Sequence, residues 1–191
     1  MCNSQSETIQ HITTGCTVLA GTQYLQRHDK SCNIIHLHLA KKDRHKIQEE
    51  PYYKYKPETV LDNEKSTIYW NKTIQTEAFT QHNKPDIVYI DKTTKLGYII
   101  DMAHPADHNL QQKETEKITK YLPLVAEMKT LYRLNKVSII PIIVSANGLI
   151  SKQTTTAAWK LQIPRRVIYK VQQNTIIETC SIVRKVLNTN I

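Results

Sequence analysis

The sequence predicts an α/β (α+β) fold, in which helices flank a mixed sheet with an antiparallel hairpin and a parallel crossover strand. Residues 87–91 and 96–102 are short runs rich in Ile, Val and Tyr around a polar four-residue loop, the pattern of a β-hairpin. Residues 137–145 form an apolar run of strand length, typical of a strand covered on both faces. Because a helical segment separates this run from the hairpin, the connection is a crossover and the strands pair in parallel.

Composition sets the broad class of protein. The chain has 191 residues, enough for one ordinary domain with a small appendage. Hydrophobic residues make up 40% of it, which predicts a packed core rather than disorder. The formal net charge of +9 favours a polyanionic partner, with nucleic acid before an anionic membrane. No run approaches the roughly 20 apolar residues of a membrane span, and the polar N-terminus lacks a signal-peptide pattern. We therefore expect a soluble intracellular protein without a membrane partner.

Residues 1–45 are predicted to form a small helical region with a partial zinc knuckle. Cys2, His11 and Cys16 have the spacing C-x8-H-x4-C, which fits three of the four ligands of a structural zinc site. No nearby position supplies the fourth ligand. Three explanations stay open: the chain lacks a preceding cysteine, Cys32 or another residue replaces it, or no zinc binds.

A helix is predicted over residues 18–40, where apolar side chains recur at three- and four-residue steps. It contains Arg27-His28-Asp29, whose basic side chains are placed to contact phosphates, although an ordinary solvated face fits the pattern equally well. His28 and His36 lie on or near the apolar stripe, which is more typical of hydrogen-bonded core histidines than of ligands.

Residues 46–66 are predicted to be a linker, because charged residues and two prolines interrupt any periodic pattern. Residues 67–191 are predicted to be the main domain. Its first segment, residues 67–82, has the pattern of a strand or a short amphipathic helix, and Phe79 is assigned to the core. Glu77 is the acidic residue of this segment that could join a later pair of carboxylates.

The open end of the hairpin carries two aspartates. Asp101 follows Asp86 after fourteen intervening residues. If Asp91 faces Leu96 across the loop, Asp86 and Asp101 fall directly opposite each other. Opposed residues have Cβ atoms roughly 5 Å apart, where two like charges destabilise the pair unless a proton or a cation lies between them. A divalent metal ion is the usual solution, and two solvated, inert acidic residues are the alternative.

The helix predicted after Asp101 carries the candidate lysines. Lys117 lies at the border of its apolar face and is best placed to point toward the sheet, whereas Lys120 lies further out. Pro123 is expected to kink this helix, so both lysines stay candidates.

Residues 152–161 and 166–187 are predicted to be the last two helices. Basic side chains from residue 160 to residue 185 form a candidate phosphate-facing surface, because neutralised phosphates release counterions and so give sequence-independent affinity. The candidate nucleic-acid contacts of the whole chain are Arg27, His28, Lys84, Arg165 and Arg166.

Two carboxylates at adjacent strand ends and a nearby lysine predict a metal-dependent phosphodiesterase. Asp86 and Asp101 would hold one or two Mg²⁺ or Mn²⁺ ions, with Glu77 as an additional candidate ligand. The ions would polarise the phosphate and lower the pKa of an attacking water. Lys117 or Lys120 would add positive charge to the transition state and orient or help deprotonate the water.

Lys84-Pro85-Asp86, fourteen residues, Asp101 and a lysine in the next helix resemble the restriction-like endonuclease of site-specific non-LTR retrotransposons. These enzymes belong to the PD-(D/E)xK nuclease superfamily. In that family the nuclease lies at the C-terminal end of a reverse-transcriptase polyprotein, after a Cys-Cys-His-Cys zinc knuckle and an Arg-His-Asp stretch. The trio C-x8-H-x4-C matches the last three knuckle positions, and YLQRHD, YYKYKPETVL, IIDMAHPADHN and TCSIVRKVL resemble insect copies in the same order.

The resemblance implies a restriction-endonuclease-like fold and a DNA endonuclease that nicks target DNA, so that reverse transcription can prime from the new 3′ end. It implies Mg²⁺ as cofactor, zinc at the knuckle, and a nuclear location. DNA, the element's RNA and the upstream reverse-transcriptase domain would be its partners. The sequence departs from the family at the first knuckle cysteine, which is absent. It also has Asp-Met-Ala at residues 101–103 instead of Asp/Glu-x-Lys, which leaves the lysine role to Lys117 or Lys120.

The sequence contains no polymerase segment, so we expect a terminal fragment of such a polyprotein or a decayed copy. The alternative function is a catalytically inactive, degenerate nuclease fold that acts as a nucleic-acid-binding module.

Overall fold

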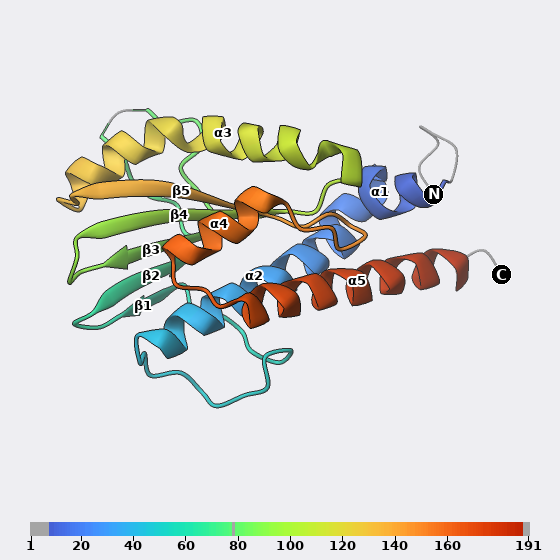
Figure 1. The fold of residues 1–191 in the computed structure, drawn as a ribbon, viewed down its shortest axis with the longest axis horizontal. Coiled ribbons are helices and arrows are strands. Elements are labelled where there is room, and N and C mark those ends of the chain that lie inside the picture. The colour runs from blue at the N-terminus through green and yellow to red at the C-terminus, as the bar shows by residue number, and fades with distance from the viewer. Residues whose placement is uncertain (1–7, 78, 189–191) are drawn as a thin grey trace.

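A five-stranded mixed sheet forms the centre of the protein, seen in a computed structural model that describes residues 8–77 and 79–188 (Figure 1). The strands lie in the order of the chain, and the first four pair with their neighbours in antiparallel fashion. The last strand pairs in parallel with the fourth. The strands are β1 (Val60–Asp62), β2 (Ser66–Trp70), β3 (Ile87–Asp91), β4 (Leu96–Ala103) and β5 (Lys136–Ile143). The predicted mixed sheet is therefore confirmed.

Helices cover both faces of this sheet (Figure 1). The helices are α1 (Thr17–Leu19), α2 (Leu25–Lys42), α3 (Leu110–Leu131), α4 (Lys152–Lys160) and α5 (Arg165–Asn188). Two π-helical segments, His11–Gly15 and Ala20–Tyr24, flank α1, and a 3₁₀ turn, Asp107–Asn109, leads into α3. Among the described residues, no helix is long and apolar enough to cross a membrane.

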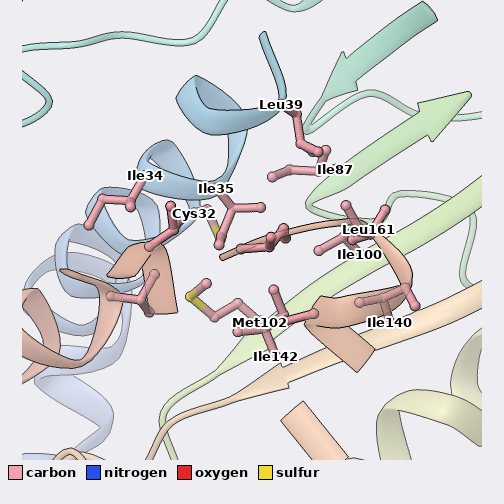
Figure 2. Packing of buried hydrophobic residues seen from close by; sticks show 14 of the residues in the cluster. Cys32, Ile34, Ile35, Leu39, Ile87, Ile100, Met102, Ile140, Ile142 and Leu161 are labelled. Atoms are coloured by element: carbon pink, nitrogen blue, oxygen red, sulfur yellow. The ribbon is translucent and has the colours of Figure 1, made fainter. Parts of the chain in front are cut away.

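The strands bury side chains on both faces, as the continuous apolar runs predict. Ile87 and Tyr89 belong to the core that α2, α4 and α5 cover. Figure 2 shows this core, with Cys32 of α2 among the packed side chains. Val88 and Ile90 point to the opposite face and pack under α3. Because successive strand residues alternate between faces, Asp101 shares the α3 face with Ile99.

The predicted hairpin register is confirmed. Asp91 pairs with Leu96 and Ile87 pairs with Ile100, on either side of the polar loop. Asp91 stabilises that loop, because its Oδ1 accepts hydrogen bonds from the backbone N–H groups of Thr93 and Thr94. Asp86 lies one residue before the start of β3, so the ladder ends just short of the two aspartates.

The structure differs from the sequence expectations in the first third of the chain. The expected linker contains β1, a three-residue strand at the sheet edge whose Leu61 is buried. Helix α2 packs in the same core as the sheet rather than in a separate region. Phe79 is 94% exposed, so its assignment to the core was wrong. A short strand between charged residues leaves almost no periodic signal, which explains why β1 was missed.

Candidate metal and phosphate site at the open end of the hairpin

Asp101 is the buried carboxylate of the site, with only 2% of its surface exposed. Its position in β4 turns the side chain toward α3, where two residues one helical turn apart meet it. Lys117 forms an ion pair with Oδ2, and the Tyr121 hydroxyl donates a hydrogen bond of 2.6 Å to Oδ1. Residues four apart lie on one face of a helix, so α3 presents an ammonium and a hydroxyl together.

These partners keep Asp101 compensated inside the protein. Burial lowers the pKa of Lys117, but Asp101, Asp86 and Glu116 together raise it by more, so Lys117 stays protonated at neutral pH. Burial, and then Asp101, raise the pKa of Tyr121, which therefore remains a hydrogen-bond donor. Asp101 is thus a buried negative charge with one cationic partner and one neutral hydrogen-bond donor.

Asp86 lies at the bend before β3, and its side chain is 19% exposed. Its Oδ2 accepts a hydrogen bond of 2.7 Å from the backbone N–H of Met102, the residue that follows Asp101. His28 Nε2 lies 3.0 Å from the same oxygen. Burial raises the pKa of Asp86, but His28, the Met102 N–H and Lys117 lower it by more, so the carboxyl is ionised. Asp86 therefore lies within the electrostatic influence of Lys117 as well as His28.

Helix α2 brings His28 and Cys32 to Asp86 from the other face of the sheet. The two residues are four apart, and Cys32 Sγ lies 3.9 Å from the His28 ring nitrogens and 3.9 Å from Asp86 Oδ2. The second His28 nitrogen, Nδ1, lies 3.1 Å from Asp29 Oδ1. Burial lowers the pKa of His28, but its neighbour Cys32 and the hydrogen bonds to Asp29 and Asp86 together raise it by more. Burial raises the pKa of Cys32 to about 12, so the thiol is protonated in this arrangement.

A pocket of about 350 Å³ opens beside His28. His104 lines it together with Tyr24 and Arg27. The Nδ1 of His104 donates a hydrogen bond of 3.0 Å to the Val144 carbonyl, which fixes the tautomer. Burial, and then the charges of Arg27 and His28, lower the pKa of His104 to about 3, so its ring is neutral. The other nitrogen, Nε2, is buried and makes no hydrogen bond to any described residue.

Of the two candidate lysines, Lys117 contacts Asp101. The ammonium of Lys120 instead lies 4.7 Å from the centre of the Tyr121 ring. Glu77 is exposed, and it does not belong to any cluster of metal-binding side chains found among the described residues. Lys84 is also exposed, and its carbonyl accepts a hydrogen bond of 3.4 Å from Tyr121.

The basic candidates have different surroundings. Arg27 is 2% exposed, and its Nη1 donates a hydrogen bond of 2.9 Å to Thr179 of α5, so its guanidinium lies inside the protein. The position of Arg27 on α2 explains this, because the same helix packs along α5. Arg165 and Arg166 are exposed at the start of α5, and the Arg165 guanidinium lies 6.0 Å from the centre of the Trp159 ring.

Of the expected zinc-knuckle residues, Cys2 lies outside the described residues. His11 begins the π-helical segment His11–Gly15 and Cys16 directly follows it, and both residues are buried. Tyr24 closes this turn, because its hydroxyl accepts from the Cys16 N–H and donates to the Ile12 carbonyl. Within the described part of the chain, His11 and Cys16 do not belong to a group of three metal-binding side chains.

Sequence reasoning missed three residues of this site. His28 was assigned to phosphate contact or to the core, and Cys32 was considered as a replacement zinc-knuckle ligand or as a buried residue, whereas both contact Asp86. Their partner is more than fifty residues away, and no local pattern records such a contact. Tyr121 had a usable signal, because it lies four residues after Lys117 on the same helical face.

The arrangement can bind a divalent cation through carboxylate oxygens, and it can place a lysine ammonium beside an anion. No protein-family profile matches the chain, and a comparison with curated proteins finds no significant match.

Proposed function

We propose that the chain is a metal-dependent DNA endonuclease, the restriction-like endonuclease region of a non-LTR retrotransposon polyprotein. One observation carries this proposal: Lys117 pairs with Asp101 and its charge also acts on Asp86, which accepts a hydrogen bond from the N–H of the residue after Asp101. The mixed sheet between helices is compatible with a restriction-endonuclease-like fold. In the parent polyprotein the partners would be DNA, element RNA and the upstream reverse transcriptase, in the nucleus. The zinc knuckle at Cys2, His11 and Cys16 belongs to the same proposal.

The donor chemistry of the two aspartates fits Mg²⁺ or Mn²⁺. Both offer carboxylate oxygens, which hard cations prefer, and the ionised form of Asp86 is favoured by its surroundings. Bound Mg²⁺ would act as a Lewis acid that polarises the scissile phosphate and lowers the pKa of the attacking water. Asp86 and Asp101 would hold it, and His28 would have to release Asp86 Oδ2 for that oxygen to become a ligand.

Lys117 would act as a cation rather than as a base. Its raised pKa keeps the ammonium protonated near neutral pH, so it has no lone pair with which to accept a proton. A fixed positive charge in a buried site stabilises the negative charge that develops on a phosphate in the transition state. Tyr121 would hold Asp101 in place through its hydrogen bond and thereby keep the Lys117 ammonium oriented.

The exposed basic residues would bind the DNA backbone. Arg165, Arg166 and Lys84 are all accessible, and the exposed ring of Trp159 beside Arg165 adds a surface on which a base can stack. Arg27 is not part of this surface because it is buried.

A second function is supported by the way the carboxylates are engaged. Asp86 is paired with His28, and Asp101 is paired with Lys117, so each negative charge already has a protein cation. Such a network is stable without a metal ion, which is what a degenerate nuclease kept for nucleic-acid binding would show.

Nicking of supercoiled plasmid DNA by the full chain, with Mg²⁺ or Mn²⁺ and with EDTA, tests the two functions. The wild type is expected to nick only with the metal ion. Asp101→Asn should lower the rate by about 100-fold or more, because the carboxylate ligand is lost while the shape is kept. The matched control is Asp91→Asn at the closed end of the same hairpin, whose amide oxygen can still accept the loop hydrogen bonds.

Binding of the same DNA, measured in parallel, separates the outcomes. The nuclease is supported if all variants bind the DNA equally and only the wild type and Asp91→Asn nick it. Folded wild-type protein that binds DNA and never nicks it rejects the nuclease in favour of the binding module.

A further inference from the structure

Three ligand atoms of different chemistry converge on the α2 side of Asp86. His28 Nε2, Cys32 Sγ and a carboxylate oxygen of Asp86 all lie within 4.8 Å of one another. The nitrogen and the oxygen are 3.0 Å apart, and the sulfur lies 3.9 Å from each residue. This trio includes neither Asp101 nor Lys117, so it is separate from the α3 half of the proposed nuclease site.

The distances suit a single tetrahedral metal ion. Zinc bonds of about 2.1 Å to nitrogen or oxygen and about 2.3 Å to sulfur place tetrahedral ligand atoms roughly 3.4–3.6 Å from each other. The two sulfur separations are slightly longer than this, and the nitrogen–oxygen separation is slightly shorter because a hydrogen bond joins those atoms. Shifts of a few tenths of an ångström would therefore accommodate the ion, which would replace the proton between Nε2 and Oδ2.

We propose that His28, Cys32 and Asp86 form a binding site for Zn²⁺ or a chemically similar transition-metal ion. A thiolate and an imidazole select such ions over Mg²⁺, which prefers oxygen ligands alone. The thiolate and the carboxylate together balance the charge of a divalent ion, so the loaded site would be neutral despite its burial. Metal binding would release the Cys32 thiol proton, as it does at other cysteine ligands.

Asp29 orients the histidine for this role. Its Oδ1 lies 3.1 Å from His28 Nδ1, so Nδ1 donates to the carboxylate and Nε2 is left to face Cys32 and Asp86. A carboxylate that accepts from the remote nitrogen is the usual support of a metal-binding histidine. Each residue of Arg27-His28-Asp29 thus has a role in this site. Asp29 orients the His28 ring, His28 supplies a metal ligand, and Arg27 links α2 to α5.

The fourth coordination position would open into the pocket of about 350 Å³ that His28 and His104 line. His104 contributes a buried Nε2 with a free lone pair, since its Nδ1 already donates to Val144. The two histidine rings lie 6.5 Å apart between centres, in an edge-to-face arrangement. Three protein ligands and one water form the open type of zinc site.

The site does not rest on the proposed endonuclease, because it would stand if the chain never cleaved DNA. The two share Asp86, so occupation by Zn²⁺ would remove one carboxylate from the Mg²⁺ site. Under the proposed function, Zn²⁺ would then inhibit Mg²⁺-dependent nicking.

Titration of the full chain with Co²⁺, a spectroscopic substitute for Zn²⁺, tests the proposal. The chain is first made metal-free and kept reduced. Because Cys2, His11 and Cys16 are a second candidate zinc site, the titration uses the variant Cys2→Ser/Cys16→Ala/Cys180→Ser, in which Cys32 is the only cysteine. We expect a thiolate-to-cobalt charge-transfer band and the visible bands of tetrahedral Co²⁺, both removed by added Zn²⁺.

Further substitutions in that background identify the ligands. Cys32→Ser should abolish the charge-transfer band, and Asp29→Asn should weaken Co²⁺ binding by about 10- to 100-fold. His108→Ala is the matched control, because His108 is exposed and lies away from the trio. Asp101→Asn should keep the band while losing any nicking, so a failure of the nuclease proposal is distinguishable from a failure of this one.

A folded background variant that shows no charge-transfer band, or a band that survives Cys32→Ser, overturns the proposal. If the background variant does not fold by circular dichroism, the wild type and the single variant Cys32→Ser are compared for bound zinc after dialysis. The wild type should then retain one more zinc ion per chain, and equal zinc contents reject the site.

Discussion

The two faces of the sheet hold the open end of the β3–β4 hairpin in different ways. On the α3 face, Asp101 is buried and is fixed by an ammonium and a phenol. On the α2 face, Asp86 is partly exposed and meets an imidazole and a thiol, both of which can bind metal ions. Two aspartates that are equivalent in the hairpin register therefore end in two chemical environments. The helix that covers each face, rather than the hairpin, decides what each carboxylate can do.

The largest effect that tests this difference is expected from Lys117→Ala. Removal of the ammonium leaves the charge of Asp101 buried with Tyr121 as its remaining partner, which should cost about 3 kcal/mol or more of unfolding free energy. Lys120→Ala on the same helix should change it by less than about 0.5 kcal/mol, because Lys120 does not contact Asp101. Urea unfolding at neutral pH measures both variants.

The double variant Lys117→Ala/Asp101→Asn checks the cause. Neutralising the orphaned carboxylate should restore much of the lost stability. Equal losses in Lys117→Ala and Lys120→Ala would instead show that the ion pair with Asp101 contributes nothing special to the α3 face.

Acid should destabilise the α2 face through its second histidine. His36 lies two turns after His28 and is fully buried, and its Nδ1 lies 2.8 Å from the Tyr55 hydroxyl. Burial, and then the charge of His45, lower the pKa of His36 from 6.5 to about 4. Between these values the unfolded chain binds more protons, so stability is full above pH 6.5 and is lost as the pH falls toward 4. The shift corresponds to about 3 kcal/mol.

The variant His36→Gln isolates this contribution. Its unfolding free energy, measured between neutral and mildly acidic pH, should depend less on pH than that of the wild type. His104, with its pKa of about 3, and His38 and His45, whose pKa values burial also lowers, are unchanged in the variant and contribute to the remaining slope in this range. An identical pH dependence in both proteins would show that His36 is not held neutral in the fold.

Periodic patterns predicted most of the fold because they record local geometry. The hairpin register followed from the loop, and the register in turn put Asp86 and Asp101 at the open end of the hairpin, just beyond the last paired residues. The helical wheel favoured Lys117 over Lys120 because three- and four-residue spacing defines the face of α3. Strand β5 was predicted from its continuous apolar run, and helices α4 and α5 were predicted as well.

The missing parts depend on contacts between distant segments. Nothing in the sequence around His28 indicates Asp86 as its partner, and the apolar stripe of α2 made Cys32 look like ordinary core. Strand β1 has only three residues, too few for an alternating pattern to be recognised. Phe79 was assigned to the core because it is apolar, but many aromatic residues are exposed in folded proteins, and Phe79 is one of them. Sequence patterns thus located the Asp101 half of the site better than the Asp86 half.

Removal of the Tyr121 hydroxyl should have a smaller effect on the α3 face than removal of the Lys117 ammonium. Tyr121→Phe keeps the ring in the core but removes the 2.6 Å hydrogen bond to Asp101 Oδ1. A hydrogen bond to a charged group contributes about 2 kcal/mol, less than the loss of a buried countercharge. Urea unfolding should therefore rank Tyr121→Phe below Lys117→Ala, with Tyr169→Phe on the exposed side of α5 as the neutral control. If Tyr121→Phe is the more destabilising of the two, the phenol rather than the ammonium is the main partner of Asp101, and the electrostatic role given to Lys117 must be abandoned.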